Sequence, residues 1–205
     1  MAGIGVRYAV FAPIESEGPD GQPIAYGEGC VVGRVVSANL DFERADTKLY
    51  ADDVVAESAN DIVGGTIALT VDHLVEDVRV KMLGDVKLDD NTMRVYSGAS
   101  PYGGFGVLRV LKYRGNYIYK AYWLYKTQYA VTSVPMETKG ETINFQPATV
   151  NGSLMPVIID ETMKPAVHDY KEFTDAAEAY SWLNSKANIT NNEAANATTG
   201  TEGAQ

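Results

Sequence analysis

The sequence predicts a mainly β protein of the α+β class: a β-sandwich or barrel with one or two short helices. Three observations support this prediction. Apolar and polar residues alternate over several segments, which is the period of a strand. Turn-forming residues separate these segments, and only residues 72–84 and 174–186 have helical spacing. Many strands with few helices are typical of a sandwich or a barrel.

The composition fits one folded domain. The chain has 205 residues, of which 45% are hydrophobic, and a chain of this length buries roughly 70% of its extended surface. Cys30 is the only cysteine, which excludes an internal disulfide and a zinc site with several cysteines. We expect one domain over residues 1–187 and a disordered tail over 188–205, where large apolar residues are almost absent.

The first part of the chain predicts three strands. Residues 6–12 (VRYAVFA) form the first, and a loop rich in turn formers covers residues 15–29. Residues 30–42 alternate as a second strand. Residues 62–71 form a third, in which the Gly-Gly pair at 64–65 predicts a bulge or twist.

Between the second and third strands the chain turns polar. Residues 43–60 show no hydrophobic period and contain clustered acids. We predict a long loop or an extended arm here, over about residues 41–61. Long loops inside compact domains are uncommon and usually functional, so this segment is a candidate for contacts between molecules.

Two short helices are predicted. The first covers residues 72–84 (DHLVEDVRVKMLG), with Asp72 as its N-cap and Gly84 at its end. The second covers residues 174–186, with Thr174 as its N-cap. Their packing residues are Leu74, Val75, Val78 and Met82 in the first helix and Ala176, Tyr180 and Leu183 in the second.

Further strands follow the first helix. Residues 92–97 and 105–113 predict two strands around a loop at 98–104, and Gly115-Asn116 predicts the next tight turn. Another strand pair is expected within residues 140–159, where prolines limit the strands to edges or ends.

Residues 115–131 (GNYIYKAYWLYKTQYAV) contain five tyrosines, a tryptophan and two lysines but no acid. This composition suits either a nucleic-acid surface or a packed strand. Strand alternation favours the packed strand, because it separates the lysines from most of the rings. One side carries Tyr117, Tyr119, Trp123, Tyr125 and Tyr129, and the other carries Lys120 and Lys126. We expect the aromatic side to cover the core or a helix and the lysines to point towards a neighbouring molecule.

Charge is unevenly distributed along the chain. Residues 41–90 contain thirteen acids and five bases, whereas residues 91–130 contain six bases and no acid. Either the two blocks neutralise each other within one molecule, or acidic and basic faces meet between copies. The net charge of −10 argues against a protein whose whole surface binds nucleic acid.

No catalytic residue, metal ligand or cofactor site is predicted. His73 has no second histidine at ligand spacing, and no serine or cysteine lies in an activating context. The first fifteen residues lack the features of a signal peptide, and no apolar run approaches the ~20 residues of a membrane span. We therefore expect a protein made in the cytoplasm, with no membrane partner.

Four stretches in order resemble the major tail tube proteins of long-tailed, non-contractile bacteriophages. The resemblance covers roughly residues 3–186 and includes a short C-terminal helix with Trp182-Leu183-Asn184. Its motifs are KLYADD at 48–53, the helix ending KMLG at 81–84, YKAYWLYK at 119–126 and ETKGETINFQPATVNGSLMP at 137–156.

The resemblance implies a structural virion protein made in the host bacterial cytoplasm. Six copies would form a ring, strands of each copy would close one β-barrel around a channel, and rings would stack into a tube. The implied partners are the tape-measure protein, the tail terminator and the distal tail proteins. Double-stranded DNA would pass through the channel without specific binding.

We expect two groups of residues to form the assembly interface. The arm contributes one group and the basic block the other; they are Asp46, Lys48, Tyr50, Asp52, Asp53, Arg94, Arg109, Lys112 and Arg114. Assembly should then weaken as salt rises. The alternatives are another tube-forming or tail component of the same fold (a tail terminator, a distal tail protein or a secretion-system tube protein) and a nucleic-acid-binding module. An enzyme is the least supported class.

Overall fold

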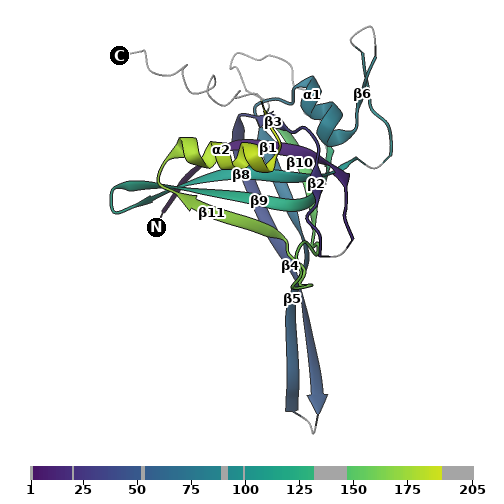
Figure 1. The fold of residues 1–205 in the computed structure, drawn as a ribbon, viewed down its shortest axis with the longest axis vertical. Helices are drawn as coiled ribbons and strands as arrows, with labels where there is room; N and C mark the ends of the chain where they lie inside the picture. Colours follow the sequence, from purple (N-terminus) through teal and green to yellow (C-terminus); the bar gives the residue numbers. More distant parts are fainter. Residues whose placement is uncertain are drawn as a thin grey trace, which may run out of the picture.

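The computed structural model confirms the mainly β, α+β fold (Figure 1), because strands make up 59% of it and helices 12%. The sheet is antiparallel, and the described part of the chain forms no closed barrel. The structure describes residues 2–19, 21–51, 54–88, 92–98, 100–131 and 147–190, and it describes only the backbone of 47–51 and 54–60. None of the helices in these ranges is long and apolar enough to cross a lipid bilayer.

Nine strands form one sheet in the order β2-β1-β8-β9-β10-β5-β4, with β3 added to β1 and β11 added to β9. Their bounds are β1 Ala2–Ser16, β2 Ala25–Tyr26, β3 Cys30–Gly33, β4 Val35–Ala51, β5 Val54–Val71, β8 Tyr102–Tyr113, β9 Asn116–Val131, β10 Ala148–Met155 and β11 His168–Phe173. A separate ribbon consists of β6 (Val86–Lys87) and β7 (Met93–Arg94). The helical elements are α1 (Glu76–Val78), the π-helical turn η1 (Arg79–Leu83) and α2 (Ala176–Lys186).

The larger core lies between two halves of the curled sheet. Phe11 of β1 and Phe105 of β8 are buried in the same cluster as Ile67 of β5 and Val150 of β10. Strand β9 joins the halves, because it pairs with β8 along one edge and with β10 and β11 along the other. Burying each such side chain contributes about 1.5–3 kcal/mol.

Helix α2 covers the outer side of the β1-β8-β9 layer (Figure 1). Leu183 of α2 is fully buried in a second cluster with Trp123 of β9 and Leu108 of β8. Its N-cap is Asp175 rather than the predicted Thr174, since the Ala177 amide donates to Asp175 Oδ1 at 3.0 Å.

The chain stays attached to α2 just beyond the predicted boundary at residue 188. The Ile189 amide donates to the Asn184 carbonyl at 2.9 Å, and the Ile189 side chain packs on the second cluster. The remainder of the predicted tail, residues 191–205, lies outside the described residues.

Strand β9 contains a bulge that changes its two-sided pattern. Leu124 lies opposite Phe105 and Thr127 opposite Gly103, so β9 has one residue more than β8 between these pairs. The extra residue reverses the alternation of side chains. Trp123 therefore packs in the cluster with α2, whereas Tyr129 packs in the larger core. The prediction that Tyr129 shares a side with Tyr117, Tyr119, Trp123 and Tyr125 is therefore wrong.

The two lysines of β9 have partners within the same chain. Lys120 Nζ lies 3.3 Å from Glu172 Oε1 and 3.8 Å from the centre of the Tyr170 ring. Lys126 Nζ lies 2.6 Å from Glu17 Oε1. The expectation that these lysines point to a neighbouring molecule is therefore wrong.

The first predicted helix is shorter than its sequence pattern. It begins at Glu76 and ends, as predicted, at Gly84, whose φ of 77° is left-handed. Asp72 does not cap it, because its Oδ1 accepts instead from the amides of Arg34 and His73 at 3.2 and 2.8 Å. Asp72 thereby fastens the end of β5 to the start of β4.

Strand β8 begins earlier than predicted because its glycines admit aromatic rings. A Cβ on Gly104 would lie 2.3 Å from Trp123 Cζ2, so the ring occupies the space that a side chain would need. The following turn is Arg114-Gly115 rather than Gly115-Asn116. Both residues have positive φ, 49° and 89°, as in a type I′ turn.

Two other predicted strand regions are only partly observed. Of residues 92–97, only Met93–Arg94 is a strand. Of the pair expected within 140–159, β10 is one member, and residues 132–146 lie outside the described part of the chain.

Candidate assembly surfaces

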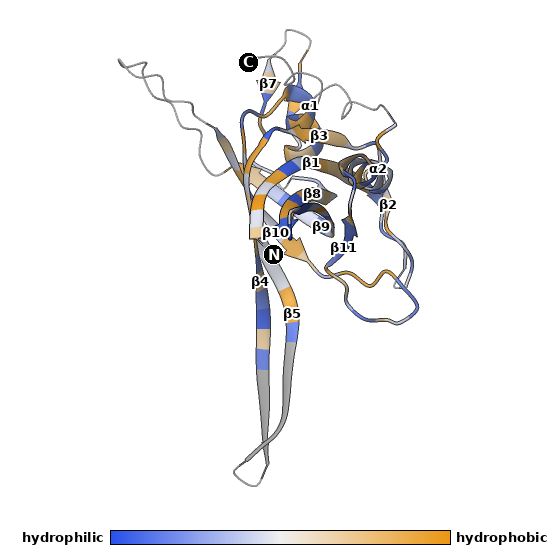
Figure 2. Ribbon diagram, turned by 90° about the vertical axis from the view of Figure 1, so that its left-hand side faces the viewer, coloured by the Kyte–Doolittle hydropathy of each residue, from blue (hydrophilic) through white to orange (hydrophobic). Residues whose placement is uncertain are grey.

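The segment predicted as a loop or an arm is a β-hairpin. Strands β4 and β5 remain paired from Val35–Val71 to Ala51–Val54, and the ribbon extends away from the domain (Figures 1 and 2). Beyond Gly65, strand β5 has only β4 beside it, because β10 pairs no further along it. We call this two-stranded part, residues 43–64, the arm.

The arm contains one of the two groups of predicted interface residues. Asp46 is exposed on β4, and the backbones of Lys48 and Tyr50 follow at alternate positions of the same strand. Asp52 and Asp53 lie outside the described residues.

A bulge marks the base of the arm. Glu43 pairs with Gly64 and Arg44 with Ile62, so Val63 is the extra residue in β5. This confirms the bulge predicted from the adjacent glycines. Bulges bend and twist a strand, and here the bend lies where the ribbon leaves the sheet.

An aromatic cluster holds the base of the arm. The rings of Phe42 (β4) and His168 (β11) stack, with centroids 5.3 Å apart and planes at 21°. Tyr122 and Tyr170 lie 5.9 and 6.3 Å from the His168 ring. Burial lowers the pKa of His168, and nearby Lys120 acts in the same direction, while Asp169 opposes both. The neutral imidazole is thus the form that this cluster favours.

The outer side of β10-β5-β4 presents small polar side chains, which we call the polar sheet face. Cross-strand partners lie on the same face of a sheet. The rows are Ser153–Thr66–Asp41, Asn151–Ala68–Asn39 and Thr149–Thr70–Ser37. All nine are exposed or half-exposed, none is a lysine or arginine, and Asp41 at the border is the one charged member.

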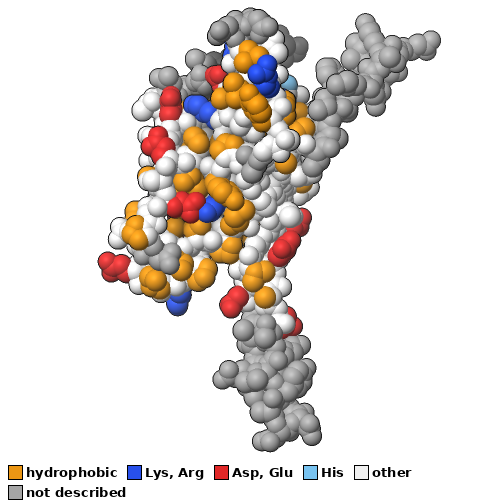
Figure 3. Space-filling view, turned by 90° about the vertical axis from the view of Figure 1, so that its right-hand side faces the viewer, with side chains coloured by type: hydrophobic (Ala, Val, Ile, Leu, Met, Phe, Trp, Pro, Cys, Tyr) orange, Lys and Arg blue, Asp and Glu red, His pale blue; other side chains and the backbone are white. Residues whose placement is uncertain are grey.

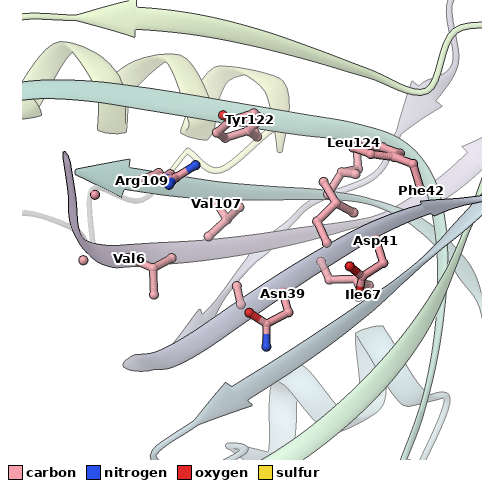
Figure 4. A pocket seen from close by; sticks show the side chains of 13 residues that line it. Val6, Asn39, Asp41, Phe42, Ile67, Val107, Arg109, Tyr122 and Leu124 are labelled. Atoms are coloured by element: carbon pink, nitrogen blue, oxygen red, sulfur yellow. The ribbon is translucent and has the colours of Figure 1, made fainter. Parts of the chain in front are cut away.

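A groove of about 660 Å³ separates β4 from the β1-β8-β9 layer (Figure 4). Val6, Leu40, Ile67, Val107 and Leu124 give it an apolar floor, and Arg109 of β8 lies on the wall opposite β4. The groove marks the place where the sheet fails to close. Strand β3 pairs with β1, but β4 pairs only with β5 among the described strands.

The structure groups three of the four predicted basic residues. Arg109, Lys112 and Arg114 lie towards the β8–β9 turn, where Lys112 and Arg114 contact the rings of Tyr117 and Tyr113 at 5.7 and 5.2 Å. No carboxylate in the described chain forms an ion pair with any of the three. Arg94 does not join them, because it lies on the separate β6–β7 ribbon. We call this end of β8–β9 the basic tip.

Exposed hydrophobic side chains also occur on other parts of the surface, with isolated charged side chains between them. Figure 3 shows apolar side chains over much of one side of the domain, with lysine, arginine and acids scattered among them. Exposed examples are Val86 and Val95, at 41% and 66% exposure, around the β6–β7 ribbon. This distribution is typical of protein surfaces and does not by itself define a site.

Metal ligands do not cluster in the described chain. No group of three or more histidine, cysteine or acidic side chains could hold a metal ion within it. His73 is exposed, and its Nδ1 lies 3.2 Å from Asp72 Oδ1.

Sequence reasoning missed the polar sheet face and the groove. The face has a signal in the sequence, since Thr66, Ala68 and Thr70 alternate with buried Ile67 and Leu69. The groove has none, because it depends on how far β4 stands from β1. Comparison with models of known protein families finds no match, and comparison with curated proteins finds no significant match.

Proposed function

We propose that the chain is the major tail tube subunit of a long-tailed, non-contractile bacteriophage, forming stacked hexameric rings around a channel. The observation that carries this proposal is the open edge of β4. This strand has 17 residues, and among the described strands its one partner is β5. A long open edge is a template for pairing with another chain. Strands of further copies would cover it and provide the closure that one chain lacks.

The polar sheet face supports a channel through which DNA passes. Its side chains are short and it contains no lysine or arginine, so a phosphate backbone would find no ion pair on it. Asp41 at its border adds repulsion. A wall of this kind lets DNA slide without binding. In the tail, the tube would enclose the tape-measure protein and end at the terminator and distal tail proteins.

A nucleic-acid-binding module is a weaker candidate. Trp123 and Tyr129 of β9 are fully buried, and Tyr125 is nearly so, so the rings at the centre of this strand offer no open stacking platform. The basic tip is the feature that favours this alternative. A tail terminator, distal tail protein or secretion-system tube protein could share the same fold.

Electron microscopy of the purified full chain tests the proposal. Stacked rings or tubes of indefinite length are the expected result, and salt should shift the threshold concentration for assembly upwards. Single rings that never stack would favour a terminator or a distal protein. Monomers that bind DNA with a strong salt dependence would contradict the proposal and favour the nucleic-acid module.

A further inference from the structure

We propose that the tip of the arm, residues 49–55 of one copy, docks in the groove between β4 and the β1-β8-β9 layer of a second copy. The acids Asp52 and Asp53 of the tip would face Arg109 on the groove wall. This inference rests on the proposed function, because it names the surfaces through which the copies of the tube meet.

The groove has the properties of a site that another chain fills. Its floor is formed by aliphatic side chains from five strands, and its volume of about 660 Å³ is enough for several side chains. It lies beside the edge of β4 that no described strand covers. Covering apolar surface is favourable at roughly 25 cal/mol per Å², so an occupied groove is the more stable state.

The arm of the same chain cannot be the occupant. From Glu43 to Ala51 strand β4 extends about 25 Å at the usual rise per residue. The ribbon extends away from the domain in both views (Figures 1 and 2). Because it is paired up to its last described residues, it cannot fold back onto its own groove without losing that pairing. A second copy must supply the tip.

The acids of the tip are opposite in charge to Arg109, the one basic side chain that lines the groove, whereas Asp41 on the β4 side of the groove carries the same charge as the tip. The sequence of the tip, LYADDVV, places apolar residues on both sides of an acid pair. Arg109 is exposed on the groove wall and has no ion-pair partner in the described chain. Lys112 and Arg114 continue the positive charge along the same hairpin. Opposite charges fix the register of two surfaces and speed their encounter.

Charge reversal tests the contact in the full-length protein. Arg109→Glu should raise the threshold concentration for assembly at least about tenfold, and the double variant Asp52→Arg, Asp53→Arg should do the same. Combining all three changes should restore assembly to near the wild-type threshold. Lys164→Glu is the matched control, because Lys164 is exposed and lies outside both surfaces. Circular dichroism checks that each variant is folded.

Disulfide trapping separates this inference from the tube itself. Gly5 lines the groove and has nothing within 4 Å of an added Cβ. In a Cys30→Ala background, Gly5→Cys together with Asp52→Cys should give a ladder of linked oligomers, whereas each single cysteine should give dimers at most. If linked oligomers form but electron microscopy shows no tubes, the result would support the docking contact and contradict the proposed tube.

Three outcomes would overturn the docking proposal. Tubes that form normally with Arg109→Glu would show that another contact joins the copies. Failure of the triple variant to assemble would show that the tip and Arg109 do not face each other. Loss of DNA binding by Arg109→Glu with assembly unchanged would make this wall a nucleic-acid surface instead.

Discussion

Phe42 and His168 stack ring on ring at the point where the arm leaves the sheet, although 126 positions separate them in the sequence. Phe42 belongs to β4, the strand that continues into the arm, and His168 begins β11. The direction of the arm at its base is therefore set by a ring that belongs to the far layer of the domain. The stack therefore ties the base of the arm to β11.

We predict that the stability of the domain falls in mild acid because of His168. Burial lowers the pKa of His168 in the folded protein, while in the unfolded chain it stays near 6.5. The unfolded state therefore binds the proton first. The stabilising contribution is complete above about pH 6.5 and is lost as pH falls through the lower, folded pKa. Urea unfolding from about pH 8 to about pH 5 measures this loss.

Replacing His168 tests the assignment. His168→Phe keeps a ring against Phe42 and removes the proton, so the midpoint should vary less with pH than in the wild type. His73→Gln is the control, since His73 is the other histidine and is exposed. An equal flattening of the pH dependence in both variants, or none in His168→Phe, would count against the role of His168.

Shortening the arm should abolish assembly without unfolding the domain. Replacing residues 47–59 with Asn-Gly leaves Asp46 and Asn60 as the last pair and closes the ribbon with a favourable two-residue turn. In this segment β4 and β5 pair only with each other among the described strands, so the sheet of the domain keeps its own pairing and the thermal midpoint should change little. Electron microscopy and sedimentation measure assembly, and normal tubes from this variant would contradict a role for the arm.

Positive charge on the polar sheet face should make the channel retain DNA. Thr66→Lys with Ser153→Lys places two cations in one row of that face, and each phosphate contact steepens the salt dependence of binding by about 0.9. DNA binding across a salt series measures the effect. Ser181→Lys, on the exposed side of α2, adds a similar charge elsewhere and should change little. Equal DNA binding by both variants would contradict the proposal that the polar sheet face lines the channel.

Adding one methyl group at Gly104 should destabilise the domain. The new Cβ would lie 2.3 Å from Trp123 Cζ2 and 2.7 Å from Tyr26 Cε1, and overpacking of this kind costs about 1–3 kcal/mol. Gly98→Ala is the matched control, because nothing lies within 4 Å of its Cβ. Chemical denaturation measures the free energy of unfolding of both variants. Equal values for the two would mean that strand β8 shifts to admit the methyl group without cost.

Local patterns in the sequence predicted much of the fold. Alternation located β1, β5 and β9, and the paired glycines located the bulge at Val63. The bulge in β9 was missed because no glycine or proline marks it, and the residues around it fit either core. The sequence does not distinguish a loop from an extended segment over the arm, because a two-stranded ribbon needs no hydrophobic period to form its backbone hydrogen bonds.

The candidate site was only partly predictable, because it depends on long-range placement. Charge alone identified Arg109, Lys112 and Arg114, but it also included Arg94, which the topology places on another ribbon. Lys120 and Lys126 looked available in the sequence, yet Glu172 and Glu17, distant along the chain, pair with them. Which charges remain without a partner is decided by the fold, and the linear pattern does not contain that information.

Selection for folding and selection for recognition between copies would act on different parts of this chain. The two strands of the arm pair only with each other among the described strands, so we expect substitutions there to carry little penalty for the folding of a single molecule. In the proposed tube they would change only how one copy recognises the next. Lineages could then diverge in the arm, and stop mixing their subunits, while the domain that carries it stays the same.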